Sequence, residues 1–173
     1  MNIRFFFKTL PKDPKSLHIW VGKTSLPHDQ LIVQLTGQNL PVAKSQNGKP
    51  YFPDSSLHFN LSDSEDRLAI AFSWRHPVGI DMEVIRPIEG MDQLIQDCFS
   101  AREQAYVKEK ETLIRFWQIW NRKEACFKAL GLGLQDHMDD WDCFGNGWIS
   151  VKGIRVRSLP IQENLSIAVA FHE

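Results

Sequence analysis

The longest stretch of helical periodicity in the chain covers residues 111–130 and is followed directly by Gly131. Its apolar residues recur at intervals of three and four, as in an amphipathic helix, and a glycine after such a run favours a helix end. Strand-like apolar runs lie on both sides, at 57–61, 68–72, 78–84, 148–151, 154–157 and 165–171. Because strands and helices do not alternate regularly, we predict the α+β class.

The remaining segments give weaker signals. The sequence indicates a short strand at 2–9, a helix in the second part of 20–36, a polar connection at 62–67, and helices at 91–99 and 101–110.

Composition narrows the classes of function. The 173 residues include 20 Lys and Arg against 21 Asp and Glu, a formal net charge of -1. Such a balance argues against nucleic acid or a membrane surface as a partner, because both require a clustered positive field. No apolar run approaches the length of a membrane span. The three cysteines show no CxxC spacing, which favours a reduced, cytoplasmic setting without a zinc site.

The run at 78–84 carries two acidic residues two positions apart. In a strand, Asp81 and Glu83 lie on one face while Ile80 and Met82 lie on the other. Two neighbouring carboxylates repel each other, and Mg²⁺ is a natural counter-charge because it prefers oxygen ligands. The alternative is an amphipathic strand whose acidic face is solvated.

The helix at 111–130 holds an unusual basic residue. Lys123 lies within the apolar arc, whereas Glu124 and Lys128 are one turn apart at its edge. The plain interpretation is a snorkelling lysine and a surface ion pair worth only ~0.3–0.5 kcal/mol. The functional interpretation makes Glu124 a metal ligand or base and Lys128 a phosphate-binding cation.

Two further segments could contact phosphate. Lys49 lies in a Gly-Lys-Pro loop at 48–50, and Ser62 follows the strand-like run at 57–61. Both side chains can donate to phosphate oxygens. An ordinary loop and an ordinary strand end remain the alternatives.

Together these segments resemble a known family. In order they are Gly-Lys-Pro at 48–50, Phe-Asn-Leu-Ser-Asp-Ser at 59–64, Gly-Ile-Asp-Met-Glu at 79–83, Phe99 with Glu103, Trp-x-x-Lys-Glu-x-x-x-Lys at 120–128 and Gly-Leu-Gly-Leu at 131–134. The order and spacing are similar to those of the 4′-phosphopantetheinyl transferase superfamily, of the surfactin-synthetase-activating (Sfp-like) type, with a shortened N-terminal half. The likeness covers about residues 46–134.

The resemblance implies an activity. It is the transfer of 4′-phosphopantetheine from coenzyme A to a serine of an apo acyl-, peptidyl- or aryl-carrier protein, with release of 3′,5′-ADP. The reaction depends on Mg²⁺, with Mn²⁺ as a substitute, and belongs to lipid or secondary-metabolite biosynthesis.

The resemblance also implies roles for residues. The metal ligands are Asp81, Glu83 and Glu124, and the catalytic residues are Glu124 and Lys128. Coenzyme A is bound by Lys49, Ser62, Asp63, Lys123 and Lys128. The implied protein is a pseudo-twofold monomer of two similar halves, 1–77 and 78–173, each a small, mainly antiparallel sheet on a long helix. Coenzyme A then lies in the cleft between them.

Two departures from the family pattern keep alternatives open. Asp63 takes the place of the usual histidine, which puts an anion where a phosphate is expected. The N-terminal half also lacks part of the usual basic set. A catalytically weak protein that binds coenzyme A or a carrier is therefore one alternative, and an unrelated Mg²⁺-dependent phosphodiesterase is another.

Overall fold

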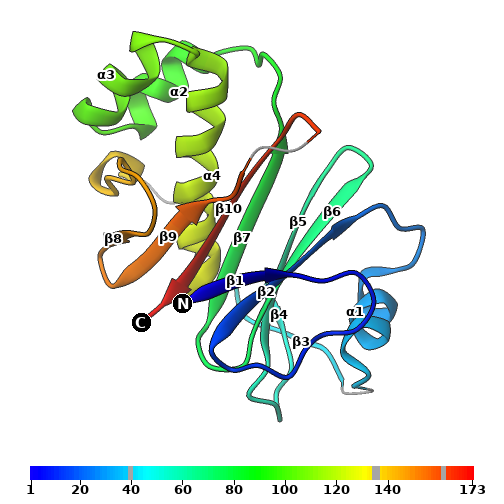
Figure 1. Ribbon diagram of the computed structural model, residues 1–173. Helices are drawn as coiled ribbons and strands as arrows, with labels where there is room; N and C mark the ends of the chain where they lie inside the picture. The colour runs from blue at the N-terminus through cyan, green and yellow to red at the C-terminus, as the bar shows by residue number, and fades with distance from the viewer. Residues whose placement is uncertain (39–40, 134–136, 161–162) are drawn as a thin grey trace.

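The computed structural model describes residues 1–38, 41–133, 137–160 and 163–173 (Figure 1). The N-terminal sheet has the strand order β1 (Asn2–Phe5), β2 (Ser16–Gly22), β6 (Arg67–Ser73) and β5 (His58–Ser64). The C-terminal sheet has the order β7 (Val78–Val84), β10 (Leu165–His172), β9 (Ile154–Ser158) and β8 (Ile149–Val151). A two-stranded ribbon joins β3 (Ala43–Lys44) to β4 (Pro50–Tyr51).

The helices are α1 (His28–Thr36), α2 (Met91–Cys98), α3 (Ala101–Glu109) and α4 (Thr112–Leu130), with a 3₁₀ turn at Met138–Asp140. All strand pairs are antiparallel except β1 with β2. This mixture confirms the predicted α+β class. Within the described residues, no helix is both long enough and apolar enough to cross a membrane.

The layers follow from which face of each strand is apolar. Side chains of α1, among them Leu31 and Ile32, pack with Ile70 and Phe72 on one face of the N-terminal sheet. The opposite face of that sheet packs against the C-terminal sheet through a buried cluster. The other face of the C-terminal sheet carries α4, as Figure 1 shows. The sheets therefore lie between α1 and α4.

Small residues let α4 approach the C-terminal sheet closely. Ala125 and Ala129 of α4 are buried against Ala168 and Ala170 of β10. At Gly79 of β7, a Cβ atom would lie only 2.1 Å from the Ala125 carbonyl oxygen and 2.4 Å from the Ala129 nitrogen. The glycine at the start of the acidic strand is therefore required by the passage of α4.

The long helix ends where the sequence predicts. Gly131 adopts a left-handed conformation, with φ 72°, and the Leu132 N–H donates to the Phe127 carbonyl at 2.9 Å. Such an end favours glycine because other residues are strained at positive φ.

Two expectations about the N-terminal half were wrong. We did not predict β2, because polar Ser16 and His18 alternate with Leu17 and Ile19 over only four residues and the residues from Trp20 onward were grouped with the segment 20–36. The segment 62–67 is not a polar connection throughout: Ser62 and Ser64 belong to β5, and the turn is confined to Glu65 and Asp66. The side chains of Ser62 and Ser64 are buried against the neighbouring sheet, which the hydropathy pattern does not reveal.

Candidate active site

The two sheets meet along β5 and β7, which lie side by side in Figure 1. The side chain of Asn60 accepts the Ile80 N–H at 2.9 Å, and Ser62 accepts the Met82 N–H at 3.2 Å. Ser64 accepts the Val84 N–H at 3.1 Å. Side chains of β5 thus satisfy backbone donors of β7 that a neighbouring strand would otherwise take. We call this junction the β5–β7 seam.

Asp81 lies on the seam, where it contacts α4. Its Oδ1 accepts from the Lys128 ammonium at 2.7 Å and from the Ser62 hydroxyl at 3.0 Å. The Asp81 side chain is 6% exposed and that of Lys128 is 29% exposed. Burial raises the pKa of the Asp81 carboxyl, and the Lys128 ammonium and the two hydrogen bonds oppose that rise.

Two more carboxyl groups belong to the same cluster. Glu83 Oε2 accepts from the Ser64 hydroxyl at 2.7 Å. Burial raises the pKa of Glu83, and the Asp81 charge adds to that rise. Burial raises the pKa of Glu124, on α4, to about 7, with repulsion from Asp81 and Glu83 acting in the same direction. The structure therefore brings Asp81, Glu83, Glu124 and Lys128 together.

A hollow of about 250 Å³ opens beside this cluster. Its lining combines the 47–49 loop, the end of α4 and the seam: Asn47, Gly48, Lys49, Asn60, Glu124, Lys128, Gly131, Leu132 and Gly133. The hollow takes residues from both the N-terminal and the C-terminal halves of the chain, and its lining includes two lysines and one carboxyl group. Leu134, the last residue of the Gly-Leu-Gly-Leu segment, lies outside the described residues.

Lys49 holds the Gly-Lys-Pro loop to the end of α4. Its ammonium donates to the carbonyl oxygens of Val78, Lys128 and Ala129 at 2.9, 2.5 and 3.3 Å. Asn47 donates to the Gly131 carbonyl at 2.8 Å. A cation is favourable at the negative end of a helix dipole. Burial nevertheless lowers the pKa of Lys49 to about 8.

The acidic cluster fits a divalent cation by its donors. Asp81 Oδ2 and Glu124 Oε1 are buried oxygens for which the described residues provide no hydrogen-bond partner. Hard carboxylate oxygens are the ligands that Mg²⁺ takes beside substrate phosphates. In the described part of the chain, no three acidic, histidine or cysteine side chains are already arranged as a ligand set. Lys128 provides the counter-charge to Asp81 in the present arrangement.

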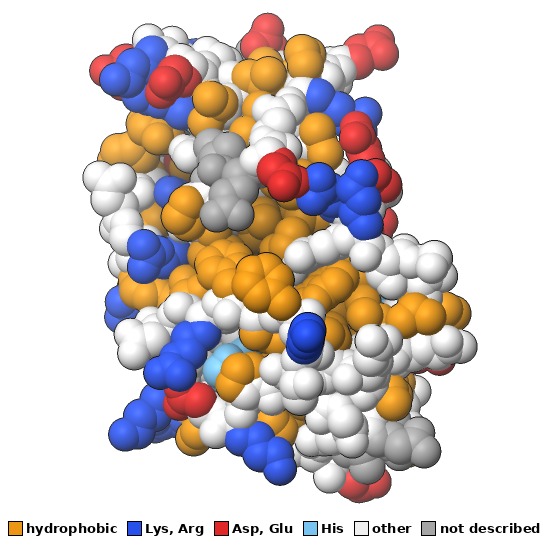
Figure 2. All heavy atoms as spheres, turned by 45° about the vertical axis from the view of Figure 1, so that its right-hand side comes forward, with side chains coloured by type: hydrophobic (Ala, Val, Ile, Leu, Met, Phe, Trp, Pro, Cys, Tyr) orange, Lys and Arg blue, Asp and Glu red, His pale blue; other side chains and the backbone are white. Residues whose placement is uncertain are grey.

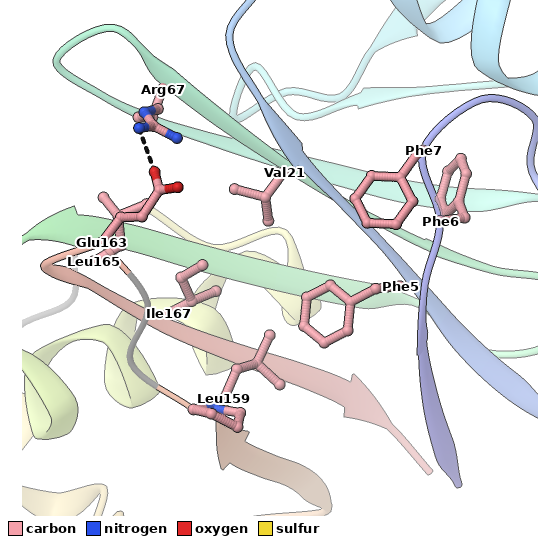
Figure 3. Close-up of a pocket in the computed structure, with 10 residues that line it drawn as sticks. Phe5, Phe6, Phe7, Val21, Arg67, Leu159, Glu163, Leu165 and Ile167 are labelled. Atoms are coloured by element: carbon pink, nitrogen blue, oxygen red, sulfur yellow. Dashed lines mark ion pairs between the residues drawn. The ribbon is translucent and has the colours of Figure 1, made fainter.

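A larger hollow, of about 350 Å³, lies between the N-terminal strand region and the β9–β10 region (Figure 3). Phe5 faces Leu159 and Ile167 across it, and the Arg67–Glu163 ion pair spans one end. The ring of Phe6 points away and packs with Phe72 on the other face of the N-terminal sheet. In Figure 2, hydrophobic side chains gather in a hollow on this side of the molecule, with charged side chains near its edge. Because its two charged groups are paired with each other, we place the chemistry in the smaller hollow.

Comparisons with known proteins show which family the chain belongs to. The profile of the 4′-phosphopantetheinyl transferase superfamily matches residues 77–170. The chain is 34% identical over 170 residues to the 4′-phosphopantetheinyl transferase AcpT of Escherichia coli strain K12, an alignment that covers 92% of this chain and 77% of that protein. The chain belongs to this superfamily.

Two other members match a shorter part of the chain. The chain is 32% identical over 112 residues to the 4′-phosphopantetheinyl transferase Sfp of Bacillus subtilis, covering 62% of this chain and 49% of Sfp. It is 41% identical over 90 residues to AcpT of Salmonella typhimurium, covering 50% of this chain and 47% of that protein. The resemblance to the superfamily that the sequence motifs indicated is thereby confirmed.

Within the transferase motif of α4, the two lysines lie in different places. Lys123 is fully buried, and its ammonium contacts Glu103 at 2.8 Å and the carbonyl oxygens of Met138 and Trp141 at 2.8 and 2.5 Å. It is therefore not brought to the hollow where we expected it to bind coenzyme A. Its partner Glu103 also accepts the Ser100 and Cys143 N–H groups, both at 2.7 Å. Lys123 and Glu103 thus join α3, α4 and the segment after the 3₁₀ turn.

Asp63, which replaces the histidine of the transferase pattern, is exposed. Because side chains alternate along a strand, it lies on the face of β5 opposite Ser62 and Ser64. The structure does not place it among the residues that line the hollow.

Sequence reasoning assigned no role to three residues of the candidate site: Asn47 and Asn60, which line the hollow, and Ser64, which contacts Glu83. The last two belong to an alternating polar set with Ser62, on a strand whose other side chains include Phe59 and Leu61. This alternation was the available signal, and it was obscured because 62–67 was interpreted as a connection.

Proposed function

We propose that this chain transfers 4′-phosphopantetheine from coenzyme A to the hydroxyl of a serine in an apo carrier protein, releasing 3′,5′-ADP in a Mg²⁺-dependent reaction. The observation that carries the proposal is the cluster of Asp81, Glu83, Glu124 and Lys128 beside a hollow at the seam. Membership of the superfamily supports the same reaction.

In the proposed reaction, the serine oxygen forms a bond to the β-phosphorus of coenzyme A. The bond from that phosphorus to the bridging oxygen breaks, and 3′,5′-ADP leaves with the electron pair. The serine proton goes to the Glu124 carboxylate, directly or through a water. A carboxylate within reach of the attacking hydroxyl can take up its proton, and Glu124 is the carboxyl group among the residues that line the hollow.

The other residues would bind and offset charge. Asp81, Glu83 and Glu124 would hold Mg²⁺, which supplies positive charge to the pyrophosphate when bound. Lys128 would contact a phosphate oxygen, because its side chain is partly exposed at the hollow. We propose that Lys49 and Ser62 support phosphate binding from the loop and the seam. Asp63 takes no part in this proposal, because its side chain lies on the opposite face of β5. For Lys123 we propose a positioning role through Glu103.

We also propose that residues 1–77 and 78–173 act as two halves with coenzyme A between them. All strands of the N-terminal sheet precede Pro77, and all strands of the C-terminal sheet follow it. The hollow takes residues from both sides of this boundary, which is a usual position for a ligand.

The test is intact mass spectrometry of an apo acyl-carrier protein incubated with this chain, coenzyme A and Mg²⁺. We expect a mass gain of one phosphopantetheine group, abolished by EDTA and by Asp81→Asn or Glu124→Gln. Binding of coenzyme A without a mass gain on acyl-, peptidyl- and aryl-carrier proteins would support the binding-protein alternative. Release of 3′,5′-ADP without a carrier would indicate hydrolysis.

A further inference from the structure

Ser64 ends β5 beside the acidic cluster, yet the proposed function gives it no role. Its side chain is buried, with the residue only 6% exposed. The hydroxyl oxygen lies 3.1 Å from the Val84 nitrogen and 2.7 Å from Glu83 Oε2. A backbone N–H can only donate and a carboxylate can only accept. The hydroxyl therefore accepts from Val84 and directs its one proton to Glu83.

The same arrangement occurs two residues earlier. Ser62 accepts the Met82 N–H at 3.2 Å and donates to Asp81 Oδ1 at 3.0 Å. In both cases the serine bonds to the N–H of one residue and to the carboxylate of the residue before it. The two serine hydroxyl groups of β5 thus bond both to the backbone of β7 and to the acidic side chains of β7.

We infer that Ser64 is a positioning residue that orients the Glu83 carboxylate as a metal ligand. This inference rests on the proposed metal site of Asp81, Glu83 and Glu124. A free glutamate side chain loses rotamer freedom when it binds a cation, and a hydrogen bond that already holds one carboxylate oxygen removes part of that cost. Loss of such an outer partner typically lowers metal affinity by about 10–100-fold.

A purely structural role for Ser64 makes a different prediction. If the hydroxyl only joined β5 to β7, its removal would lower the stability of the fold. The folded protein would then bind the metal as tightly as wild type. Ser73 provides a matched control, because it is a buried serine on β6 whose hydroxyl accepts the Arg75 and His76 N–H groups at 3.3 and 3.0 Å. Its bonds are to backbone donors alone, whereas those of Ser64 also reach a carboxylate.

The experiment measures the affinity of the full chain for Mn²⁺ by electron paramagnetic resonance, with coenzyme A present, for wild type, Ser64→Ala, Ser64→Thr, Ser73→Ala and Asp81→Asn. We expect Ser64→Ala to weaken Mn²⁺ binding about 10-fold or more. Ser64→Thr, which keeps the hydroxyl, should stay within about threefold of wild type, as should Ser73→Ala. The melting temperature of each variant shows how much fold stability was lost.

Two results would overturn the inference and are distinguishable. If Ser64→Ala binds Mn²⁺ like wild type while Asp81→Asn does not, the metal site stands and the role of Ser64 is wrong. If wild type and Asp81→Asn bind Mn²⁺ equally weakly, the proposed metal site itself fails, and the role of Ser64 fails with it. If Ser64→Ala does not fold, Ser64→Val at a lower temperature takes its place, with Ser64→Thr as the folded reference.

Discussion

Two lysine–carboxylate pairs hold α4 in place, one at the α3 side and one at the β5–β7 seam. Both side chains of the Lys123–Glu103 pair are 0% exposed, and both groups have further partners in the backbone. The Lys128–Asp81 pair is partly open, and Asp81 Oδ2 is buried without a hydrogen-bond partner among the described residues. The first pair has its hydrogen bonds completed by other groups of the protein. In the second pair, the partly exposed Lys128 ammonium and one Asp81 oxygen can still bind a ligand.

We infer from this difference that one lysine of α4 stabilises the fold and the other takes part in the reaction. A buried ion pair whose remaining bonds are complete has no capacity left for a substrate. An incompletely satisfied pair in a hollow is where binding energy can act, and perturbed carboxyl groups are concentrated in such places. The Glu124 carboxyl group, whose pKa is raised to about 7, lies beside the second pair. We therefore expect substitutions at the first pair to change stability and those at the second to change transfer.

The largest effect is expected at the closed pair. Lys123→Met leaves the Glu103 carboxylate buried without its counter-charge, which typically costs about 3–5 kcal/mol of stability. Chemical unfolding of wild type and variant measures this loss. Adding Glu103→Gln to Lys123→Met should recover part of it, because no uncompensated charge then remains. An unchanged free energy of unfolding for Lys123→Met would remove the distinction between the two pairs.

At the open pair, the expected effect is on the reaction. Lys128→Met removes the cation that we propose for the pyrophosphate, so the transfer rate should fall about 10²-fold, or ~2.7 kcal/mol. Stability should fall by less than in Lys123→Met, because Asp81 keeps its bond from Ser62. Initial rates at varied coenzyme A concentration measure the change. Lys108→Met, an exposed lysine on α3, serves as the matched control and should transfer like wild type.

A further effect is expected where α4 crosses β7. Gly79→Ala would place a methyl carbon 2.1 Å from the Ala125 carbonyl oxygen, so the strand and the helix must move apart, and overpacking of this kind costs about 3 kcal/mol or more. The displacement that relieves this clash moves α4 away from Asp81, which lies two residues after Gly79 on β7. Transfer should therefore fall more than the change in unfolding free energy alone explains. Equal transfer per folded molecule would show that the open pair tolerates this displacement.

The smallest effect is a dependence of stability on pH. Burial lowers the pKa of Lys49 from its ordinary 10.5 to about 8. Between these values the unfolded chain binds more protons at this lysine than the folded chain does, so the free energy of unfolding should rise as pH increases from about 8 to about 10.5. Lys49→Met should show a shallower rise across that window in urea unfolding. An identical slope in both proteins would contradict this account of Lys49.

Much of the C-terminal half could be predicted from the sequence. The strand at β7, the helix α4 and the end of that helix at Gly131 are local features, set by alternation, by helical periodicity and by the conformational freedom of glycine. By contrast, β2 was missed because the alternation of Ser16 and His18 with Leu17 and Ile19 covers only four residues, and the rest of the strand was grouped with the segment 20–36. Ser62 and Ser64 were not predicted to belong to a strand, because their hydroxyl groups are buried only by contact with β7, which is a separate segment of the sequence.

The sequence by itself determined the types of the main elements, the acidic residues on one face of β7, and the family. Helical spacing placed Lys123 within the apolar arc and Lys128 at its edge, but the resemblance to the family implied a coenzyme A-binding role for both. The tertiary structure decided which lysine faces Glu103 and which faces Asp81. That decision depends on what lies against each face of α4, and the close passage at Gly79 sets how near the helix comes to the acidic strand.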